Sequence, residues 1–210
     1  MEQQGILVVV SGFSGAGKGT LMKALLEKYD NYALSISATT RKPREGEVDG
    51  REYFFKTVEE FEQLIDHDNL IEYAKYVDNY YGTPKDYVEQ QLASGKDVIL
   101  EIEIQGALKV KAKRPDTVLI FVTPPSAGEL EKRLIGRGTE TMDVIKSRLR
   151  RANEEAEGMS GYDYVLINDD LDQCVKELHA IIQSEHSAAV RNQLFINRIS
   201  DELKGLMKGE

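Results

Sequence analysis

Apolar residues along the chain fall into two kinds of segment. Short runs rich in apolar residues occupy 6–10, 97–104, 117–122 and 164–168. Between them, apolar residues recur every three or four positions, as at Leu21 and Leu25. The first kind is typical of strands buried on both faces, and the second of helices with one buried face. Their alternation predicts an α/β fold with a doubly wound parallel sheet, to which the alternating stretch 33–38 adds a short strand.

The middle of the chain breaks this regular alternation. The predicted elements there are a polar loop at 39–47, a strand at 52–56, a helix opened by a capping box at Thr57, a strand at 70–77, a turn at 79–82 and a helix from Thr83 to Gly95. Several of these elements are short, aromatic or polar, unlike the apolar core strands. We therefore interpret 39–95 as a small lobe inserted into the core.

The second half of the chain returns to alternating strands and helices. The predicted helices are 105–113, 126–136, 142–157 and 171–184, followed by an amphipathic helix over 185–210. A glycine- and threonine-containing loop at 137–143 separates the second and third of these helices. The last helix has two interpretations, either a surface helix packed on the domain or a dimer contact.

A glycine-rich loop joins the first apolar run to the first helix. Its residues are Gly12, Phe13, Ser14, Gly15, Ala16, Gly17, Lys18, Gly19 and Thr20. A buried strand, a GxxxxGK loop and a helix are the context of a phosphate-binding P-loop. Glycines let backbone N–H groups converge on a phosphate, and the helix N-terminus and the lysine add positive charge. The loop therefore predicts binding of a nucleoside triphosphate, against the alternative of a plain glycine turn with a solvated lysine.

One position departs from the usual P-loop pattern. Gly19 follows Lys18 where serine or threonine normally ligates magnesium, and the hydroxyl comes one place later, at Thr20. We expect a magnesium ion here to rest mainly on phosphates and water, with Thr20 at an inner phosphate.

Composition and charge narrow the class of protein. The 210 residues are 41% apolar and 30% charged, which is typical of a globular domain, and no apolar run is long enough to span a membrane. The net charge of −9 argues against nonspecific nucleic-acid binding. Cys174 is the single cysteine, so no internal disulfide can form, and a cytoplasmic location is expected. Clusters of arginine at 41–51 and 133–151 still allow a small anionic ligand.

Several further motifs occur in one order along the chain. They are Ser-Ile-Ser-Ala-Thr-Thr-Arg at 35–41, Asn-Tyr-Tyr-Gly-Thr at 79–83, Pro-Pro-Ser at 124–126, Arg-Leu-Ile-Gly-Arg-Gly-Thr-Glu-Thr at 133–141 and Asn-Asp-Asp at 168–170. Together with the P-loop, this pattern resembles the guanylate kinase family from about Gly5 to Ser184. The resemblance implies transfer of the γ-phosphoryl group of ATP to GMP, with GMP or dGMP as acceptor and Mg²⁺ as cofactor.

The resemblance implies a division of the chain. The P-loop NTPase core would comprise 5–38, 96–135 and 160–184, the GMP-binding lobe 39–95 and a mobile lid 136–159, with 185–210 as an extension beyond the family pattern. A monomer or homodimer without nucleic-acid or membrane partners is expected.

The implied GMP site lies in the lobe. Arg41 and Arg44 would bind the GMP phosphate, because a planar guanidinium matches phosphate geometry, and Tyr53 and Tyr81 would add neutral donors. Glu47, in the same loop, is also implied at this site. In isolation, this loop could equally be a solvated basic loop.

The guanine base would be read by a carboxylate. The resemblance assigns this role to Glu72, with Ser37 and Thr83 at the base edge. Guanine offers N1–H and a 2-amino group to one carboxylate, whereas adenine offers neither there, so such a site discriminates by about 10⁴ or more. Taken alone, Glu72 could also be an outward glutamate on an edge strand.

Two acidic residues close the run 97–104. Glu101 and Glu103 are predicted to share one face of a strand, at the carboxyl end where α/β sheets bind ligands. By resemblance Glu101 holds magnesium through water and Glu103 stands near GMP. Glu103 departs from the aspartate usual in the family.

The implied catalytic cations are Lys18 and three arginines. Phosphoryl transfer spreads charge over the equatorial oxygens, so cations and positioning supply most of the catalysis. By resemblance Arg133 and Arg137 belong to the ATP side, and Arg148 reaches the transferred group. Arg150 and Arg151 are interpreted as surface charges on a helix.

Two other classes of protein share parts of this pattern. Guanylate-kinase-like domains of scaffolding proteins bind peptides, but they typically lack an intact P-loop. Other nucleoside-monophosphate or sugar-phosphate kinases share the core. Glu72 and the loop from Arg41 to Tyr53 favour a GMP acceptor instead.

Overall fold

The computed structural model describes residues 4–76, 78–136 and 141–207, and it contains two sheets. The larger sheet has the order β2-β7-β1-β8-β9, and its paired strands are all parallel. Its strands are β1 (Leu7–Gly12), β2 (Tyr32–Leu34), β7 (Asp97–Glu101), β8 (Val118–Thr123) and β9 (Tyr164–Ile167). The predicted parallel α/β core is confirmed.

Helices cover both faces of this sheet because residues of its strands alternate between two cores. Val8 and Val10 of β1 face α1 (Lys18–Lys28) and α7 (Leu171–His186), whereas Leu7 and Val9 face α3 (Lys85–Ala93) and α4 (Ile104–Lys113). All four β1 residues are at most 2% exposed, so this strand is the centre of the hydrophobic core. The turn after β1 is thereby fixed at the carboxyl edge of a rigid sheet.

The second sheet forms the lobe, with the order β4-β3-β6-β5. Its elements are β3 (Ala38–Thr39), β4 (Phe54–Phe55), α2 (Val58–Asp66), β5 (Leu70–Tyr76) and β6 (Asn79–Pro84). Phe61 of α2 is fully buried and packs with Ala38 and Leu70. The capping box at Thr57 is confirmed, since its side chain accepts from the Glu60 N–H and the Glu60 side chain accepts from the Thr57 N–H.

Three local predictions in and beside the lobe were wrong. The stretch 33–38 is not one strand, because Leu34 ends β2 of the core sheet and Ala38 begins β3 of the lobe sheet. Residues 79–82 are not a turn but part of β6, which pairs with both β5 and β3. The run 97–104 is a strand only to Glu101, because α4 begins at Ile104.

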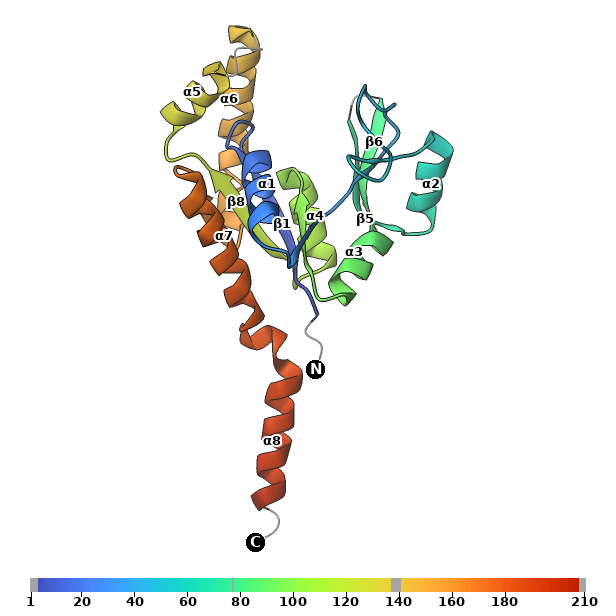
Figure 1. The fold of residues 1–210 in the computed structure, drawn as a ribbon, viewed down its shortest axis with the longest axis vertical. Helices are drawn as coiled ribbons and strands as arrows, with labels where there is room; N and C mark the ends of the chain where they lie inside the picture. Colours follow the sequence, from blue (N-terminus) through green and yellow to red (C-terminus); the bar gives the residue numbers. More distant parts are fainter. Residues whose placement is uncertain (1–3, 77, 137–140, 208–210) are drawn as a thin grey trace.

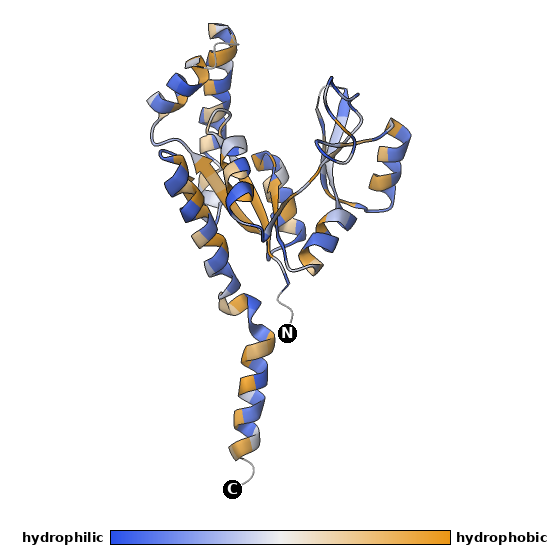
Figure 2. Ribbon diagram, viewed as in Figure 1, coloured by the Kyte–Doolittle hydropathy of each residue, from blue (hydrophilic) through white to orange (hydrophobic). Residues whose placement is uncertain are grey.

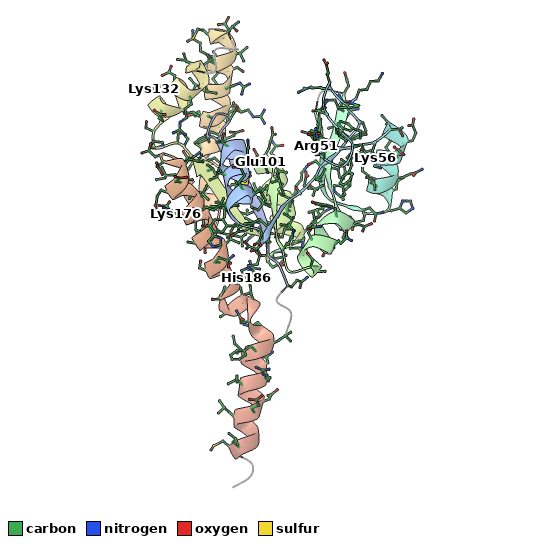
Figure 3. All side chains as sticks on the ribbon, in the orientation of Figure 1. Arg51, Lys56, Glu101, Lys132, Lys176 and His186 are labelled. Atoms are coloured by element: carbon green, nitrogen blue, oxygen red, sulfur yellow. The ribbon has the colours of Figure 1, made fainter. Side chains whose placement is uncertain are left out.

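Two arms stand above the core in Figure 1, with the start of α1 between them. One arm is the lobe, and the other is the pair α5 (Ala127–Gly136) and α6 (Met142–Ala156). Arg51, labelled in Figure 3, lies on the lobe, and Glu101 lies on the core between the arms. The P-loop, which leads into α1, thus lies between the two arms.

The C-terminal segment leaves the body of the molecule. After α7, a short turn η2 (Ala189–Arg191) leads into α8 (Gln193–Met207), which projects away from both sheets (Figure 1). The helix predicted over 185–210 is present as α8, but its predicted start was wrong, because α7 continues to His186 and η2 precedes Gln193. Among the residues that the structure describes, no helix is long and apolar enough to cross a membrane.

Candidate active site

The glycine-rich loop adopts a conformation that only its glycines permit. Gly15 and Gly17 have φ angles of 95° and 88°, in the left-handed region, and Gly17 is the N-cap of α1. A Cβ at Gly12 would lie 2.1 Å from the carbonyl oxygen of Val122 on the neighbouring strand. The loop can therefore turn sharply out of β1 and present the α1 N-terminus to a ligand.

Lys18 folds back over the loop at the start of α1. Its Nζ donates to the carbonyl oxygens of Gly12 (2.7 Å) and Phe13 (3.2 Å). These hydrogen bonds between the Lys18 ammonium and the carbonyl dipoles keep the positive charge inside the loop, where phosphate oxygens would lie.

A buried asparagine supports the loop from the last strand. Asn168, 6% exposed, donates from Nδ2 to the carbonyl oxygen of Ala16 at 2.8 Å. The backbone carbonyl oxygen of Asn168 accepts from Nη1 of Arg133 at 2.9 Å, and Nε of the same arginine donates to Glu129. From sequence, Asn168 was only part of the motif at 168–170, although its place after the apolar strand 164–167 puts it at the same sheet edge as the loop. Arg133 is therefore tied to the P-loop through Asn168.

A cavity of about 550 Å³ lies between the P-loop and α6. Its walls include Lys18, Glu101 and Glu103 from the core and Arg148, Arg151 and Glu155 from α6. Nη1 of Arg148 donates to the Ser14 hydroxyl of the P-loop. The structure thus brings four of the predicted charged residues to one cavity, namely Lys18, Glu101, Glu103 and Arg148.

Glu103 and Arg151 occupy places that differ from the prediction. Glu103 does not share a strand face with Glu101, because it lies beyond β7 as the N-cap of α4. Its Oε2 lies 2.8 Å from Nη2 of Arg151, and Nε of Arg151 donates to Glu155 at 3.1 Å. The pKa of the Arg151 guanidinium is raised, chiefly by the charge of Glu103. Arg151, interpreted from sequence as an ordinary surface charge, is therefore part of the cavity wall.

A smaller hollow of about 260 Å³ adjoins the start of α1, and Lys18, Thr20 and Glu101 line it. Withdrawal of the Glu101 carboxyl from bulk water raises its pKa, and the nearby Lys18 charge lowers it. Carboxylate and hydroxyl oxygens are ligands that suit Mg²⁺ when most of its shell is phosphate and water. Within the described part of the chain, no group of three or more His, Cys, Asp or Glu side chains could hold a metal ion alone.

The lobe buries a carboxylate on β5, an edge strand of its sheet. Glu72 of β5 is 8% exposed, and its Oε1 accepts from the Thr83 hydroxyl at 2.8 Å. Burial raises the pKa of Glu72, while the Thr83 hydrogen bond and the charges of Lys109 and Lys113 lower it. Burial of an ionisable group with a single neutral donor is costly, so the arrangement calls for further N–H donors from a ligand.

The arginine loop is organised around Glu47. The Glu47 carboxylate accepts two hydrogen bonds from Arg41, both at 2.9 Å, and a third from the Arg44 N–H at 2.7 Å. The hydrogen bonds from the Arg41 guanidinium and then the Arg44 backbone lower the pKa of Glu47 to about 2. Glu47 therefore orients Arg41, and its predicted place at the GMP site stays a prediction.

Two aromatic rings pack against the same guanidinium. The Arg41 guanidinium lies 5.2 Å from the Tyr53 ring centroid and 5.7 Å from that of Phe55. Tyr53 and Tyr81 are 6.2 Å apart, edge to face. The structure thus gathers Arg41, Tyr53 and Tyr81 into one cluster, with Arg44 exposed at its rim.

Two predicted residues remain to be placed. Ser37 is half-buried on the segment between the two sheets, where its carbonyl oxygen accepts from the Phe54 N–H at 2.9 Å. Arg137 lies outside the described residues.

Comparison with known proteins gives a consistent result. The family model described as Guanylate kinase matches residues 4–185. A guanylate kinase of Caldanaerobacter subterraneus is 52% identical over 202 residues, which cover 96% of this chain and 98% of the relative. One of Lactococcus lactis is 52% identical over 186 residues, or 89% and 91% of the two chains. The crystal structure of guanylate kinase from Anaplasma phagocytophilum superposes with a TM-score of 0.71 at 31% identity and covers 91% of each chain.

Proposed function

Because the chain belongs to the guanylate kinase family and transfers the γ-phosphoryl group of ATP to GMP, we propose that the P-loop cavity holds ATP and the lobe holds GMP. The division into a core (5–38, 96–135, 160–184), a GMP-binding lobe (39–95) and a lid (136–159) is part of this proposal. The observation that carries it is the buried Glu72 carboxylate, which has Thr83 as its hydrogen-bond donor within the chain.

The ATP side is built on the first helix. Backbone N–H groups of Gly15 to Thr20 take the phosphates, and Lys18 lies at the outer ones. Arg133 has its guanidinium fixed by Glu129 and Asn168, which supports its role on the ATP side. Arg137 completes the set by family resemblance.

The GMP phosphate binds at the arginine loop. Arg41 is pre-oriented by Glu47 and by the rings of Tyr53 and Phe55, so little side-chain entropy is lost when a phosphate binds. Arg44 contributes a second guanidinium, and the Tyr53 and Tyr81 hydroxyls add neutral donors. A planar guanidinium with a fixed orientation suits a phosphate monoester better than a flexible ammonium.

The guanine base pairs with Glu72. Its N1–H and 2-amino group supply the donors that the buried carboxylate needs, with Thr83 on the same carboxylate and Ser37 nearby. Adenine would leave the carboxylate unpaired in a dry site, so selectivity of about 10⁴ is expected. Glu103 stands on the acceptor side of the cavity.

Magnesium fits the hollow beside Thr20 and Glu101. The ion supplies charge neutralisation for the phosphates when it is bound. Glu101 would hold the ion through its water shell, and Thr20 would contact an inner phosphate.

The remaining contribution to catalysis is electrostatic. Arg148 reaches from α6 to the P-loop, at Ser14, so closure of the lid brings its charge to the transferred group. No general base is required, because the acceptor is already a phosphate oxygen. Closure also keeps water from intercepting the phosphoryl group.

We further propose a cytoplasmic location, dGMP as a second acceptor and no nucleic-acid or membrane partner. The net charge of −9 supports the last point. A peptide-binding scaffold role is disfavoured by the complete P-loop with Lys18 in place.

An assay of ADP release with GMP, AMP, dTMP or no acceptor tests the proposal. ADP release that depends on GMP and exceeds that with AMP by orders of magnitude is expected. Release with AMP but not with GMP would contradict it.

A further inference from the structure

Glu72, the carboxylate assigned to the guanine base, has a hydrogen-bond donor on only one of its two oxygens. The Thr83 hydroxyl donates to Oε1 at 2.8 Å, and among the described residues no group donates to Oε2. Both oxygens of an ionised carboxylate accept hydrogen bonds, and leaving one unpaired in a buried site costs free energy. Oε2 is therefore the atom of Glu72 that is left for a ligand.

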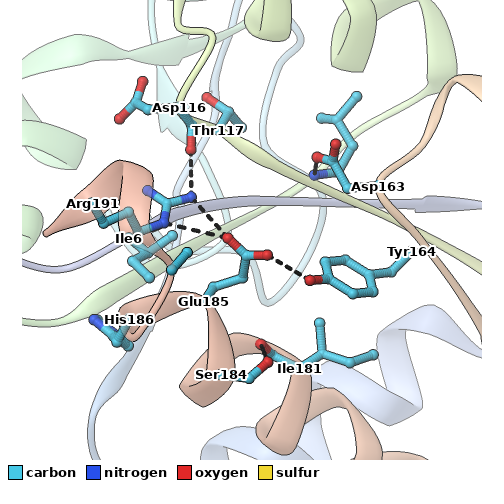
Figure 4. Close-up of polar contacts among 12 residues, drawn as sticks. Ile6, Asp116, Thr117, Asp163, Tyr164, Ile181, Ser184, Glu185, His186 and Arg191 are labelled. Atoms are coloured by element: carbon cyan, nitrogen blue, oxygen red, sulfur yellow. Dashed lines mark hydrogen bonds and ion pairs between the residues drawn. The ribbon is translucent and has the colours of Figure 1, made fainter. Parts of the chain in front are cut away.

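Glu185, whose side chain is 17% exposed, shows the pairing that Glu72 lacks. It accepts from the Tyr164 hydroxyl at Oε1 and from the Arg191 guanidinium at Oε2 (Figure 4). The chain itself thus satisfies both oxygens, as is usual for a structural carboxylate away from solvent. Glu72 is more buried than Glu185 and still has one neutral donor, so a ligand is the simplest source of the second.

Helix α4 lies between the core sheet and Glu72. It packs against β1 and β8 of the core and against β5 of the lobe. The helix carries apolar and polar bands in Figure 2, and its residues Ala107 and Val110 are fully buried in the core. Burial raises the pKa of Glu72, and the charges of Lys109 and Lys113 on α4 lower it. α4 is thus a core helix that approaches the carboxylate of the lobe.

Gly106, in the first turn of α4, lies against Oε2 of Glu72. A Cβ built on Gly106 would lie 3.5 Å from Oε2 and 3.2 Å from Cδ1 of Ile102. The first distance is ordinary van der Waals contact, and the second involves the end of a side chain that can shift slightly. The fold itself therefore has room for a methyl group at position 106.

The backbone does not require a glycine at this position either. Gly106 lies inside a helix and is not among the glycines with a positive φ. Alanine stabilises a helix more than glycine does, so glycine here lowers the stability of α4. A residue that opposes a local preference without a gain in the fold is expected at a functional site. The space beside Oε2 is the feature that this glycine provides.

We propose that Gly106 determines specificity for the 2-amino group of guanine, which lies beside Gly106 and donates to Oε2 of Glu72. This inference rests on the proposed binding of GMP at Glu72. N1–H and the 2-amino group project side by side from one edge of guanine, so they meet the two oxygens of one carboxylate. The exocyclic amino group needs more room than the ring N–H. It therefore takes Oε2, where the chain has no side chain in the way.

A methyl group at position 106 would act on the ligand more than on the fold. The amino nitrogen must come to about 3 Å from Oε2 to donate a hydrogen bond. A methyl carbon 3.5 Å from the same oxygen would narrow that approach. The base of IMP differs from guanine only in lacking this amino group, and it keeps N1–H and the ribose phosphate. Comparison of GMP with IMP therefore isolates the contact at Gly106.

Steady-state kinetics of the full-length protein with GMP and with IMP test the proposal. Gly106→Ala should lower kcat/KM for GMP by about 10-fold or more and that for IMP by less than about three-fold. The preference for GMP over IMP should therefore fall, while the KM for ATP stays unchanged. The melting temperature should be unchanged or higher, because alanine favours the helix.

Gly128→Ala is the matched control. Gly128 also lies in the first turn of a helix, α5, and the nearest atom to an added Cβ outside that helix backbone is Oγ of Ser126 at 3.9 Å. This variant should keep the wild-type preference for GMP over IMP. The same preference in Gly106→Ala would overturn the proposal, and so would equal losses with GMP and IMP.

Glu72→Gln separates this inference from the proposed function on which it rests. Loss of the preference for GMP over AMP in Glu72→Gln would support the reading of guanine by Glu72. If Gly106→Ala then kept its preference for GMP over IMP, only the role of Gly106 would be wrong. If Glu72→Gln kept the preference for GMP over AMP, the assignment of the acceptor site, and with it this inference, would be wrong.

Discussion

Nη2 of Arg151 lies 2.8 Å from Oε2 of Glu103, and this ion pair joins α6 to the N-terminus of α4 across the P-loop cavity. Glu103 remains in the cavity wall while it pairs with Arg151. The pair thus connects α6 to the start of α4 beside the P-loop.

We predict that the pair orients Glu103 for GMP. Arg151→Ala should raise the KM for GMP by about two- to five-fold, because a partly exposed pair contributes little more. The KM for ATP should stay unchanged, and so should both constants in Arg150→Ala, the neighbouring exposed arginine. In a Glu103→Asp background, Arg151→Ala should have no further effect on the KM for GMP. Additive effects in this double-mutant cycle would show that the two residues act separately.

A second prediction concerns the hydrogen bond from Asn168 to the P-loop. Asn168→Ala removes the hydrogen bond to the Ala16 carbonyl and leaves that buried group unpaired, at a cost of about 1–3 kcal/mol. The melting temperature should fall by roughly 2–10 °C, and the KM for ATP should rise more than the KM for GMP. Equal increases in both constants would indicate general loosening of the fold instead.

Arg148 should act on the transition state. Arg148→Ala is predicted to lower kcat by about 10³-fold or more, because its charge is needed most when the phosphoryl group is in transfer. Both KM values should change far less than kcat. Arg150→Ala, two residues along the same helix, should retain near-normal kcat. A lower kcat in both variants to the same degree would mean that helix α6, and not the Arg148 charge, is responsible.

Much of this site could be predicted from local sequence, and the predictions that were wrong have a common cause. The P-loop and the Thr57 capping box depend on residues within a few positions of one another, so their patterns predicted them. Residues 79–82, the start of β6, were predicted as a turn because the pairing partners of this strand, β3 and β5, supply the hydrogen bonds that no local pattern shows. Tertiary context overrides local preference in such strands.

The partners of the charged residues could not be predicted from the sequence either. The pairing of Glu47 with Arg41, only six residues away, was not predicted, because sequence does not show which acid a guanidinium selects. Asn168 and Ala16 are 152 positions apart, and Arg151 and Glu103 are joined only by the packing of α6 on the core. Sequence identified the chemical groups, and the fold decided which of them meet.

The raised pKa of Glu72 predicts a pH dependence for acceptor binding. Recognition of guanine needs the ionised carboxylate, and burial raises its pKa above the ordinary 4.5. As pH falls through that raised pKa, Glu72 is protonated and kcat/KM for GMP should decline. The decline should begin at a higher pH than an ordinary glutamate would give and should be absent in Glu72→Gln. The KM for ATP, measured over the same range, is the control and should not follow this curve.

The raised pKa of Glu72 also affects the free energy of unfolding. The unfolded chain ionises Glu72 at a lower pH than the folded chain does, so folding stability should fall as pH rises between the two pKa values. Glu72→Gln should remove this contribution. Its thermal unfolding, compared with wild type across that pH window, should show a smaller loss of stability as pH rises.

The ratio of kcat/KM for GMP to that for AMP, measured in wild type and in Glu72→Gln, tests the central claim most directly. Wild type should prefer GMP by about 10⁴ or more. The variant should lose most of this preference while keeping its KM for ATP, because only the reading of the base has changed. A variant that retained the full preference for GMP would show that Glu72 does not read guanine and would contradict the assignment of the acceptor site.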